Sequence, residues 1–204
     1  MHMRKQASQA EKVVKLAKTH GFLRGKDLLA HGIHHEHLRR LCSKGVFLRV
    51  GRGVYRLAEA DTTEHITLAT VAKRIPNGVI CLLSALRFHN IGTQNSPDVW
   101  LALKQKTAPP REKDLPLRIV WFSDVSYETG TETHSLEGVT VQITNPAKTV
   151  VDCFKYRNKI GMDVALEALK ECLGKRKCSP SELWEYAKVC RVANVMRPYL
   201  EIVE

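Results

Sequence analysis

The chain has 204 residues, of which 44% are hydrophobic, as expected of a globular protein that buries a core. No apolar run approaches the roughly 18 residues that a membrane-spanning helix needs. The basic N-terminus lacks the apolar stretch of a secretory signal, so we expect a cytoplasmic protein that does not bind membranes. The six cysteines include no Cys-x-x-Cys pair. We therefore expect free thiols without a disulfide framework, and only Cys172 and Cys178 leave a redox or metal role open.

The net charge of +11 is concentrated at the start of the chain. Residues 1–57 hold 13 lysines and arginines against three acidic residues, a net charge of +10, whereas residues 58–204 have a net charge of +1. A compact basic segment beside a neutral remainder is typical of a protein that binds a polyanion with that segment. We therefore expect two domains, residues 1–60 and 61–204, with a linker at 58–63.

Glycines divide the basic segment into three helical patterns, because Gly21, Gly32 and Gly45 each follow an apolar stripe. The second expected helix covers about residues 26–30 and the third about residues 34–44. Strands at 46–50 and 54–57 follow, joined by a Gly-Arg-Gly turn that places Arg52 at the tip of a tight hairpin. This order predicts a winged helix-turn-helix domain. The side chains that we expect to be buried on the second and third helices are Leu28, Leu29, Leu38, Leu41 and Cys42.

The third helix has an apolar back and a mainly basic front, which suits insertion into the major groove of DNA. Arg40 lies in the middle of this front and is our candidate for contact with a base, followed by His37 and Arg39. The arginines of the wing can reach phosphates or a neighbouring minor groove. The alternative is that the domain binds a protein and that its basic face is only solvated. The residues that we expect to contact DNA are Arg24, Lys26, His34, His35, His37, Arg39, Arg40, Lys44, Arg49, Arg52 and Arg56.

A cluster of histidines, His34-His35-Glu36-His37, opens the third helix. Only His34 and His37 have the spacing of a helical metal-binding pair, so we expect no metal site. Contact with DNA is the simpler role, because the N-terminal end of a helix favours phosphate.

Residues 61–204 carry mixed strand and helix signals, so the fold class that we predict for the whole chain is α+β. Strands are expected at 98–103, 117–122 and 139–143, and the apolar run 79–83 fits a buried strand or the lead-in to a helix at 84–90. Asn145 and Pro146 suit the N-cap and first position of a helix, and Ser179 and Glu182 form the capping box of another. These signals predict a small sheet followed by a helical C-terminal part.

Motifs for catalysis or cofactor binding are missing from the sequence. It contains neither a GxxxxGK[ST] loop nor a GxGxxG turn, so we expect no cofactor and no enzyme. Ser84, His89 and Asp98 have the residue types of a catalytic triad, but nothing else supports one, and Ser84 fits a helix cap better. The carboxylates near the predicted strands form no recognisable nuclease set, which leaves a DNA-acting nuclease as a lesser alternative.

Three stretches in series carry a resemblance to a known family. GVFLRVGRGVYRL (45–57) resembles the wing of the AbiEi antitoxins of type IV toxin–antitoxin systems, and LLSALRFH (82–89) and NPAKTVVD (145–152) resemble later parts of the same family. The three occur in the expected order over most of the chain. Beyond residue 159 the helices match the family in character rather than in motif.

The resemblance implies a DNA-binding antitoxin that represses its own operon through inverted repeats on double-stranded DNA, with a dimer on the DNA as a compatible arrangement. It also implies a cognate nucleotidyltransferase-type toxin, opposed directly or indirectly by the C-terminal domain. Lys148 and Asp152 are the candidate antitoxin residues, although Asp152 also fits a helix anchor. The alternative function is a plain transcription regulator whose C-terminal domain binds a ligand or dimerises, with no toxin.

Overall fold

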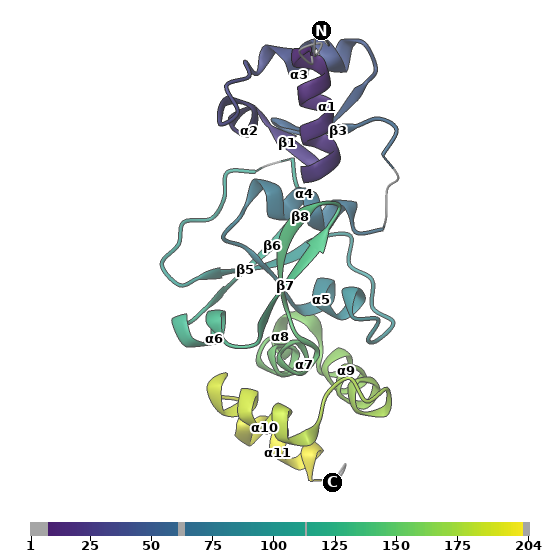
Figure 1. Cartoon of the computed structure of the whole chain (residues 1–204). Helices are drawn as coiled ribbons and strands as arrows, with labels where there is room; N and C mark the ends of the chain where they lie inside the picture. Colours follow the sequence, from purple (N-terminus) through teal and green to yellow (C-terminus); the bar gives the residue numbers. More distant parts are fainter. Residues whose placement is uncertain (1–7, 61–63, 113, 202–204) are drawn as a thin grey trace, which may run out of the picture. The chain divides into compact units, whose positions relative to one another are not determined.

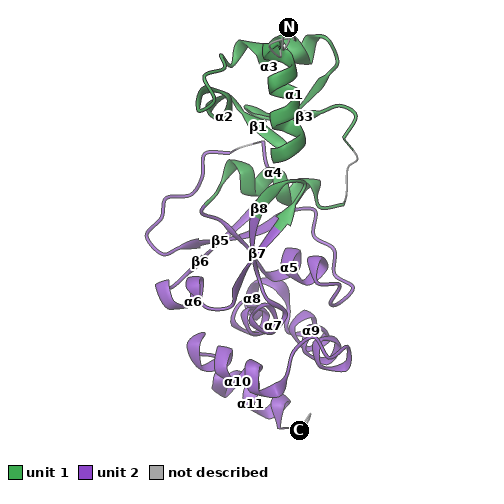
Figure 2. Cartoon of the chain, viewed as in Figure 1, with its two compact units in different colours: residues 1–76, 135–140 green, residues 77–134, 141–204 purple. Residues whose placement is uncertain are grey.

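A computed structural model of the chain describes residues 8–60, 64–112 and 114–201. It divides into two compact units, shown in Figure 2: unit 1 comprises residues 1–76 and 135–140, and unit 2 comprises residues 77–134 and 141–204. The predicted boundary between residues 60 and 61 stays a prediction, and residues 61–63 of the expected linker lie outside the described residues. None of the described helices is long and apolar enough to cross a membrane.

Unit 1 contains a winged helix-turn-helix (Figure 1). Its three strands form an antiparallel sheet in the order β1-β3-β2, with Leu48 of β2 opposite Arg56 of β3. A further helix, α4, follows the wing. The elements of unit 1 are α1 (Gln9–His20), β1 (Phe22–Arg24), α2 (Gly25–Leu29), α3 (Glu36–Ser43), β2 (Phe47–Gly51), β3 (Val54–Leu57) and α4 (Ile66–Arg74).

Local signals explain where these helices begin and end. Ser8 and Glu11 form a capping box at the start of α1, and the chain leaves the helix at Gly21, whose φ of 64° favours glycine. The apolar stripes of the three helices then meet over the sheet in one core. The buried members of this core are Val13, Ala17, Leu23, Leu28, Ile33, Leu38, Leu41 and Phe47.

Unit 1 differs from the sequence-based expectations in three respects. Strand β1 was not predicted, because three residues are too few to show strand alternation. Leu29, expected to be buried, is 59% exposed, because the five-residue helix α2 turns only Leu28 into the core. Cys42 is only partly buried.

Unit 2 is built on a mixed five-stranded sheet in the order β6-β5-β4-β8-β7. β5 runs parallel to β6 and antiparallel to β4, and β4 runs parallel to β8. The strands are β4 (Val79–Ile80), β5 (Val99–Lys104), β6 (Leu117–Phe122), β7 (Thr131–Leu136) and β8 (Val139–Thr144), of which the tips of β7 and β8 at residues 135–140 group with unit 1.

The helices of unit 2 gather around α7, which packs against α5, α9 and α10 (Figure 1). The Asn145 side chain caps α7 by accepting a hydrogen bond from the Lys148 amide, and the Ser179–Glu182 capping box starts α10, so both predicted caps are confirmed. The helices are α5 (Leu82–Phe88), α6 (Asp124–Glu128), α7 (Pro146–Lys155), α8 (Arg157–Ile160), α9 (Met162–Gly174), α10 (Pro180–Val189) and α11 (Ala193–Leu200).

The predicted helix cap at Ser84 is wrong. Cys81 occupies the N-cap of α5, and Ser84 lies within the helix, where its Oγ accepts a hydrogen bond from the Trp100 amide at 2.9 Å. The apolar run 79–83 combines both expected alternatives, since Val79 and Ile80 form β4 and Leu82 already belongs to α5.

Candidate nucleic-acid interface

Helix α3 separates an apolar side from a polar side. Leu38 and Leu41 are buried at 1% and 7% exposure, and they fix the helix onto the core of unit 1. His37 is half-buried. The cationic and imidazole side chains that lie exposed on or beside the helix are those of His34, His35, Arg39, Arg40 and Lys44. The helix therefore presents a face rich in cationic and imidazole groups, as a recognition helix does.

Glu36 is the acidic residue in the first turn of α3, and two arginines of the following turn lie near its carboxylate. Arg39 Nε donates to both carboxylate oxygens of Glu36, at 2.9 and 3.1 Å, and Arg39 Nη2 lies 2.7 Å from Oε1. Arg40 Nε lies 3.9 Å from the same oxygen. The hydrogen bonds from Arg39 lower the pKa of Glu36, and the carboxylate in turn raises the pKa of Arg39.

The wing exposes two arginine side chains. Arg52 is exposed at the turn between β2 and β3, next to Gly53, whose φ is 70°. Arg49 is exposed on β2, where its Nε donates to the Gly51 carbonyl at 3.3 Å. Both side chains can reach a phosphate without breaking the fold.

Two further predicted DNA-contact residues, both partly buried, also donate to main-chain carbonyls. Arg56 Nη1 donates to Leu57 O at 3.3 Å and to Ala60 O at 2.8 Å, which ties down the chain after the wing. Arg24 Nη1 donates to the carbonyl of Lys73 on α4 at 3.0 Å. Their place in DNA binding stays a prediction, and their structural role competes with it. Lys26 is exposed.

Asp27 links the start of α2 to α4. Its carboxylate accepts a hydrogen bond from the Arg24 amide at 2.8 Å and lies 2.9 Å from Lys73 Nζ. Partial burial raises the pKa of Asp27, but these hydrogen bonds outweigh burial and bring it below its usual value. The acid therefore strengthens the helix-turn-helix and does not add a free negative charge near α3.

The histidines at the start of α3 do not gather into a metal site. The rings of His34 and His35 lie 4.3 Å apart, and His34 Nδ1 accepts a hydrogen bond from the Glu36 amide at 3.2 Å. Among residues 8–60, 64–112 and 114–201, no group of three or more histidine, cysteine or acidic side chains could hold a metal ion.

Lys148 and Asp152, the candidate antitoxin residues, form an ion pair inside unit 2. Both are 0% exposed, and Lys148 Nζ lies 2.6 and 2.5 Å from the two carboxylate oxygens. The ammonium also lies 4.4 Å from the centre of the Phe122 ring, and Cys190 Sγ lies 3.6 Å from Asp152 Oδ1. The expectation of an antitoxin surface at these residues is therefore wrong in its placement. That Lys148 and Asp152 take part in toxin neutralisation stays a prediction. Because both side chains are fully buried, they cannot contact a toxin directly in the folded state.

The ionisation of this pair reflects its burial. Burial raises the pKa of the Asp152 carboxyl, although the neighbouring ammonium acts against this. Burial lowers the pKa of Lys148, but the Asp152 carboxylate outweighs burial, so that the pKa lies above its usual value. The pair anchors α7 at the centre of its helix group.

The three residues with the types of a catalytic triad, Ser84, His89 and Asp98, each bind a separate partner. Ser84 is bound to the Trp100 amide, His89 Nε2 donates to the Thr144 carbonyl at 2.8 Å, and Asp98 pairs with Arg118 at 2.7 Å. These partners satisfy each group separately, so no nucleophile–base–acid relay is formed.

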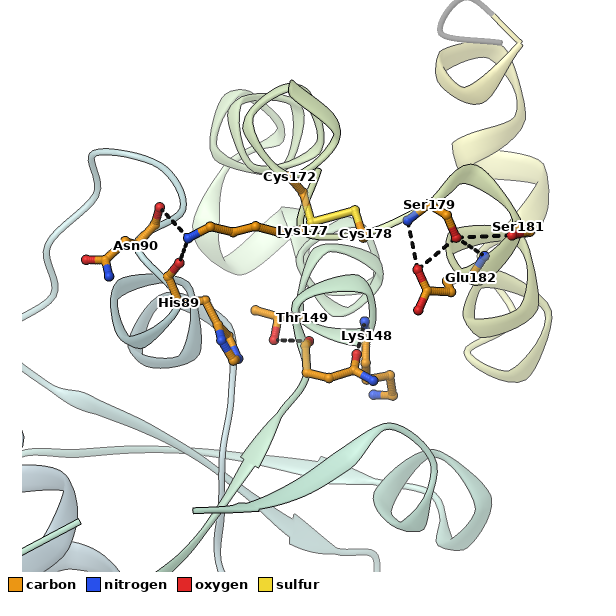
Figure 3. Close-up of a disulfide and its surroundings, with 11 residues drawn as sticks. His89, Asn90, Lys148, Thr149, Cys172, Lys177, Cys178, Ser179, Ser181 and Glu182 are labelled. Atoms are coloured by element: carbon orange, nitrogen blue, oxygen red, sulfur yellow. Dashed lines mark hydrogen bonds between the residues drawn. A yellow bond between two sulfur atoms is a disulfide. The ribbon is translucent and has the colours of Figure 1, made fainter. Parts of the chain in front are cut away.

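Cys172 and Cys178 form a disulfide, which corrects the expectation of free thiols (Figure 3). The chain turns back after α9 and brings the two Cα atoms to 5.7 Å, within the range of a disulfide. Lys177, inside the closed loop, donates to the carbonyls of His89 and Asn90, as Figure 3 shows. A spacing of five residues between cysteines carries no signal of its own, so the sequence could not indicate this pairing.

Comparison with known proteins identifies the N-terminal region. The family described as transcriptional regulator, AbiEi antitoxin, matches residues 11–58, which span α1 to the end of the wing. This confirms the resemblance over that region, and the description of the matched family is that of a transcriptional regulator. The crystal structure of the RV2827C protein from Mycobacterium tuberculosis aligns with a TM-score of 0.60 at 14% identity, covering 91% of this chain and 73% of that chain. At that identity the likeness concerns the fold alone. No protein with curated annotation matches the chain.

Proposed function

We propose, from the membership of residues 11–58 in the AbiEi antitoxin and transcriptional-regulator family, that this chain is a DNA-binding antitoxin. Its winged helix binds inverted repeats on double-stranded DNA and represses the operon that encodes the antitoxin and its toxin. Unit 2 counteracts a toxin of the nucleotidyltransferase type, by direct or indirect action.

The observation that carries the DNA-binding part is the placement of charge. Five of the 13 lysines and arginines of residues 1–57 are exposed on or beside α3 and on the wing, namely Arg39, Arg40, Lys44, Arg49 and Arg52, while α3 is fixed to the core by its opposite side. A helix held in this way can enter the major groove, and the wing arginines can then contact the backbone beside it. Glu36 offsets one positive charge of this face by pairing with Arg39, and Asp27 pairs with Lys73 on α4. The exposed side chains of Arg40, Lys44, Arg49 and Arg52 keep the face basic.

The antitoxin part rests on the family match and on the concentration of positive charge before residue 58, which leaves the remainder of the chain nearly neutral. Unit 2 has its own sheet and its own core, so it can carry a second activity. A plain transcription regulator would share the winged helix and differ only in unit 2. The identity of the downstream gene distinguishes the two functions, since a nucleotidyltransferase gene there favours the antitoxin.

The test pairs a promoter reporter with a growth-rescue assay in cells that express the downstream gene. Arg49→Ala/Arg52→Ala should relieve repression and leave rescue intact, because these side chains contact DNA and not the toxin. Lys170→Ala, an exposed substitution on α9 in unit 2, is the matched control and should leave repression unchanged. Loss of repression and rescue together, at normal protein levels, would contradict the assignment of separate activities to the two units.

A further inference from the structure

We infer that Arg39, oriented by Glu36, reads a guanine of the operator in the major groove. This inference rests on the proposed function and deepens it. The sequence favours Arg40 as the residue that contacts a base, whereas this inference assigns that contact to Arg39. The basis is the way in which the arginine uses its five N–H donors.

Glu36 engages one side of the Arg39 guanidinium and leaves its end free. The Glu36 carboxylate accepts hydrogen bonds from Arg39 Nε at 2.9 and 3.1 Å and lies 2.7 Å from Nη2. It therefore binds the side of the guanidinium that carries the Nε hydrogen. Both hydrogens of Nη1 and the second hydrogen of Nη2 remain for another partner. Those two nitrogens form the fork that matches O6 and N7 of guanine, so Glu36 and a guanine can bind Arg39 at the same time.

The pairing also restricts how Arg39 moves before DNA arrives. The Arg39 side chain is 81% exposed, so without a partner it would sample many rotamers. A guanidinium held in one plane loses less freedom when it binds a base, and a positioned reader discriminates more sharply than a mobile one.

Arg40 lacks this restraint. Its Nε lies 3.9 Å from Glu36, beyond hydrogen-bond distance, and its side chain is 70% exposed. A long, mobile cation of this kind suits a phosphate, which accepts charge from many directions. We therefore assign Arg40 to the DNA backbone and Glu36 to a positioning role.

The experiment starts with the full chain and a pool of random-sequence duplexes, from which the wild-type protein selects its preferred site. Each guanine of the selected site is then replaced in turn by 7-deazaguanine, which removes the N7 acceptor and leaves base pairing intact. Affinity is measured at one fixed salt concentration for the wild type, Arg39→Ala, Arg39→Lys and Arg40→Ala. Arg39→Lys keeps the charge and removes the fork, so it separates base reading from phosphate contact.

At one guanine, we expect the 7-deaza replacement to weaken the wild type, and Arg39→Ala to be insensitive to it. Arg39→Ala and Arg39→Lys should each lose roughly 5- to 150-fold affinity for the selected site and much less for random DNA. Arg40→Ala should lose affinity equally on both DNAs and keep its sensitivity to 7-deazaguanine. If Arg40→Ala becomes insensitive instead, or Arg39→Ala keeps its sensitivity, Arg39 is not the reader.

The positioning role of Glu36 is tested by comparing Glu36→Gln with Glu59→Gln. Glu59 is exposed in the segment after the wing, and its substitution removes the same single negative charge. Glu36→Gln should lower the ratio of selected-site to random affinity, because Arg39 becomes mobile and free to bind phosphate. Glu59→Gln should leave that ratio unchanged. Identical effects of the two variants would overturn the positioning role. A wild type that selects no site and binds DNA independently of salt would instead refute the proposed function itself.

Discussion

Replacing Lys148 with methionine should strongly destabilise unit 2. The substitution keeps an unbranched side chain of similar length but leaves the Asp152 carboxylate fully buried without its ammonium. Breaking a buried ion pair by removing one partner costs about 3–5 kcal/mol of unfolding free energy. The Cys190 thiol at 3.6 Å is too weak a donor to replace the ammonium.

Tryptophan fluorescence during urea unfolding reports on this unit, because all three tryptophans, Trp100, Trp121 and Trp184, belong to it. With a urea dependence of about 2 kcal/mol per molar, the expected loss moves the unfolding midpoint down by about 2 M. The exposed substitution Lys170→Met on α9 is the control and should change stability by less than about 0.5 kcal/mol.

The double variant Lys148→Met/Asp152→Leu separates charge from packing. It removes both charges, and we expect it to recover most of the stability that the single variant loses, because apolar groups often replace a buried ion pair at little cost. A single variant that loses less than about 1 kcal/mol, or a double variant no more stable than the single one, would refute the reasoning.

Three further predictions concern unit 1. Arg49→Ala or Arg52→Ala should weaken binding to all DNA sequences and reduce the slope of log affinity against log salt by about one unit each, measured by titration at several salt concentrations; an unchanged slope would show that neither residue contacts phosphate. Because the pKa of Asp27 lies below its usual value, its contribution to stability is present above about pH 3.8 and is lost as the pH falls through the folded-state pKa. Acid unfolding of Asp27→Asn, followed by circular dichroism, should lack this loss, and an identical acid profile would contradict it. A fragment of residues 1–76 should unfold at higher urea than one of residues 1–60, because α4 contributes the Lys73 contacts; equal midpoints would support a boundary at residue 60.

The sequence predicted those parts of the fold that have strong local signals. The helix stop at Gly21, the Asn145 cap and the Ser179 capping box depend on neighbouring residues, and the structure has each of them. The stops predicted at Gly32 and Gly45 fall after the ends of α2 and α3, whose C-caps are Ala30 and Lys44. Strand β7 escaped prediction because an edge strand need not alternate apolar and polar residues, and Glu132 lies exposed on it. Helices α6 and α8, of five and four residues, are too short for a helical period.

In the candidate site, too, the sequence predicted what local patterns encode and missed what depends on the folded chain. Charge and spacing were enough to place a basic face on α3 and the wing, but not to show which arginines were already engaged. The hydrogen bonds of Arg24 and Arg56 to main-chain carbonyls depend on how the chain folds back, which spacing does not encode. The Glu36–Arg39 pair could have been found, because an acid three residues before an arginine on an exposed helical face is a recognised pattern. The pattern of cations alone does not indicate this pair.

The buried Lys148–Asp152 pair also limits how this sequence can change over evolutionary time. A substitution at either position alone passes through a protein with one uncompensated charge in its core, which selection for a folded chain removes. The two positions should therefore change together in related sequences, or not at all. Neighbouring core positions such as Val151, which carry no charge, can exchange for other aliphatic residues one at a time.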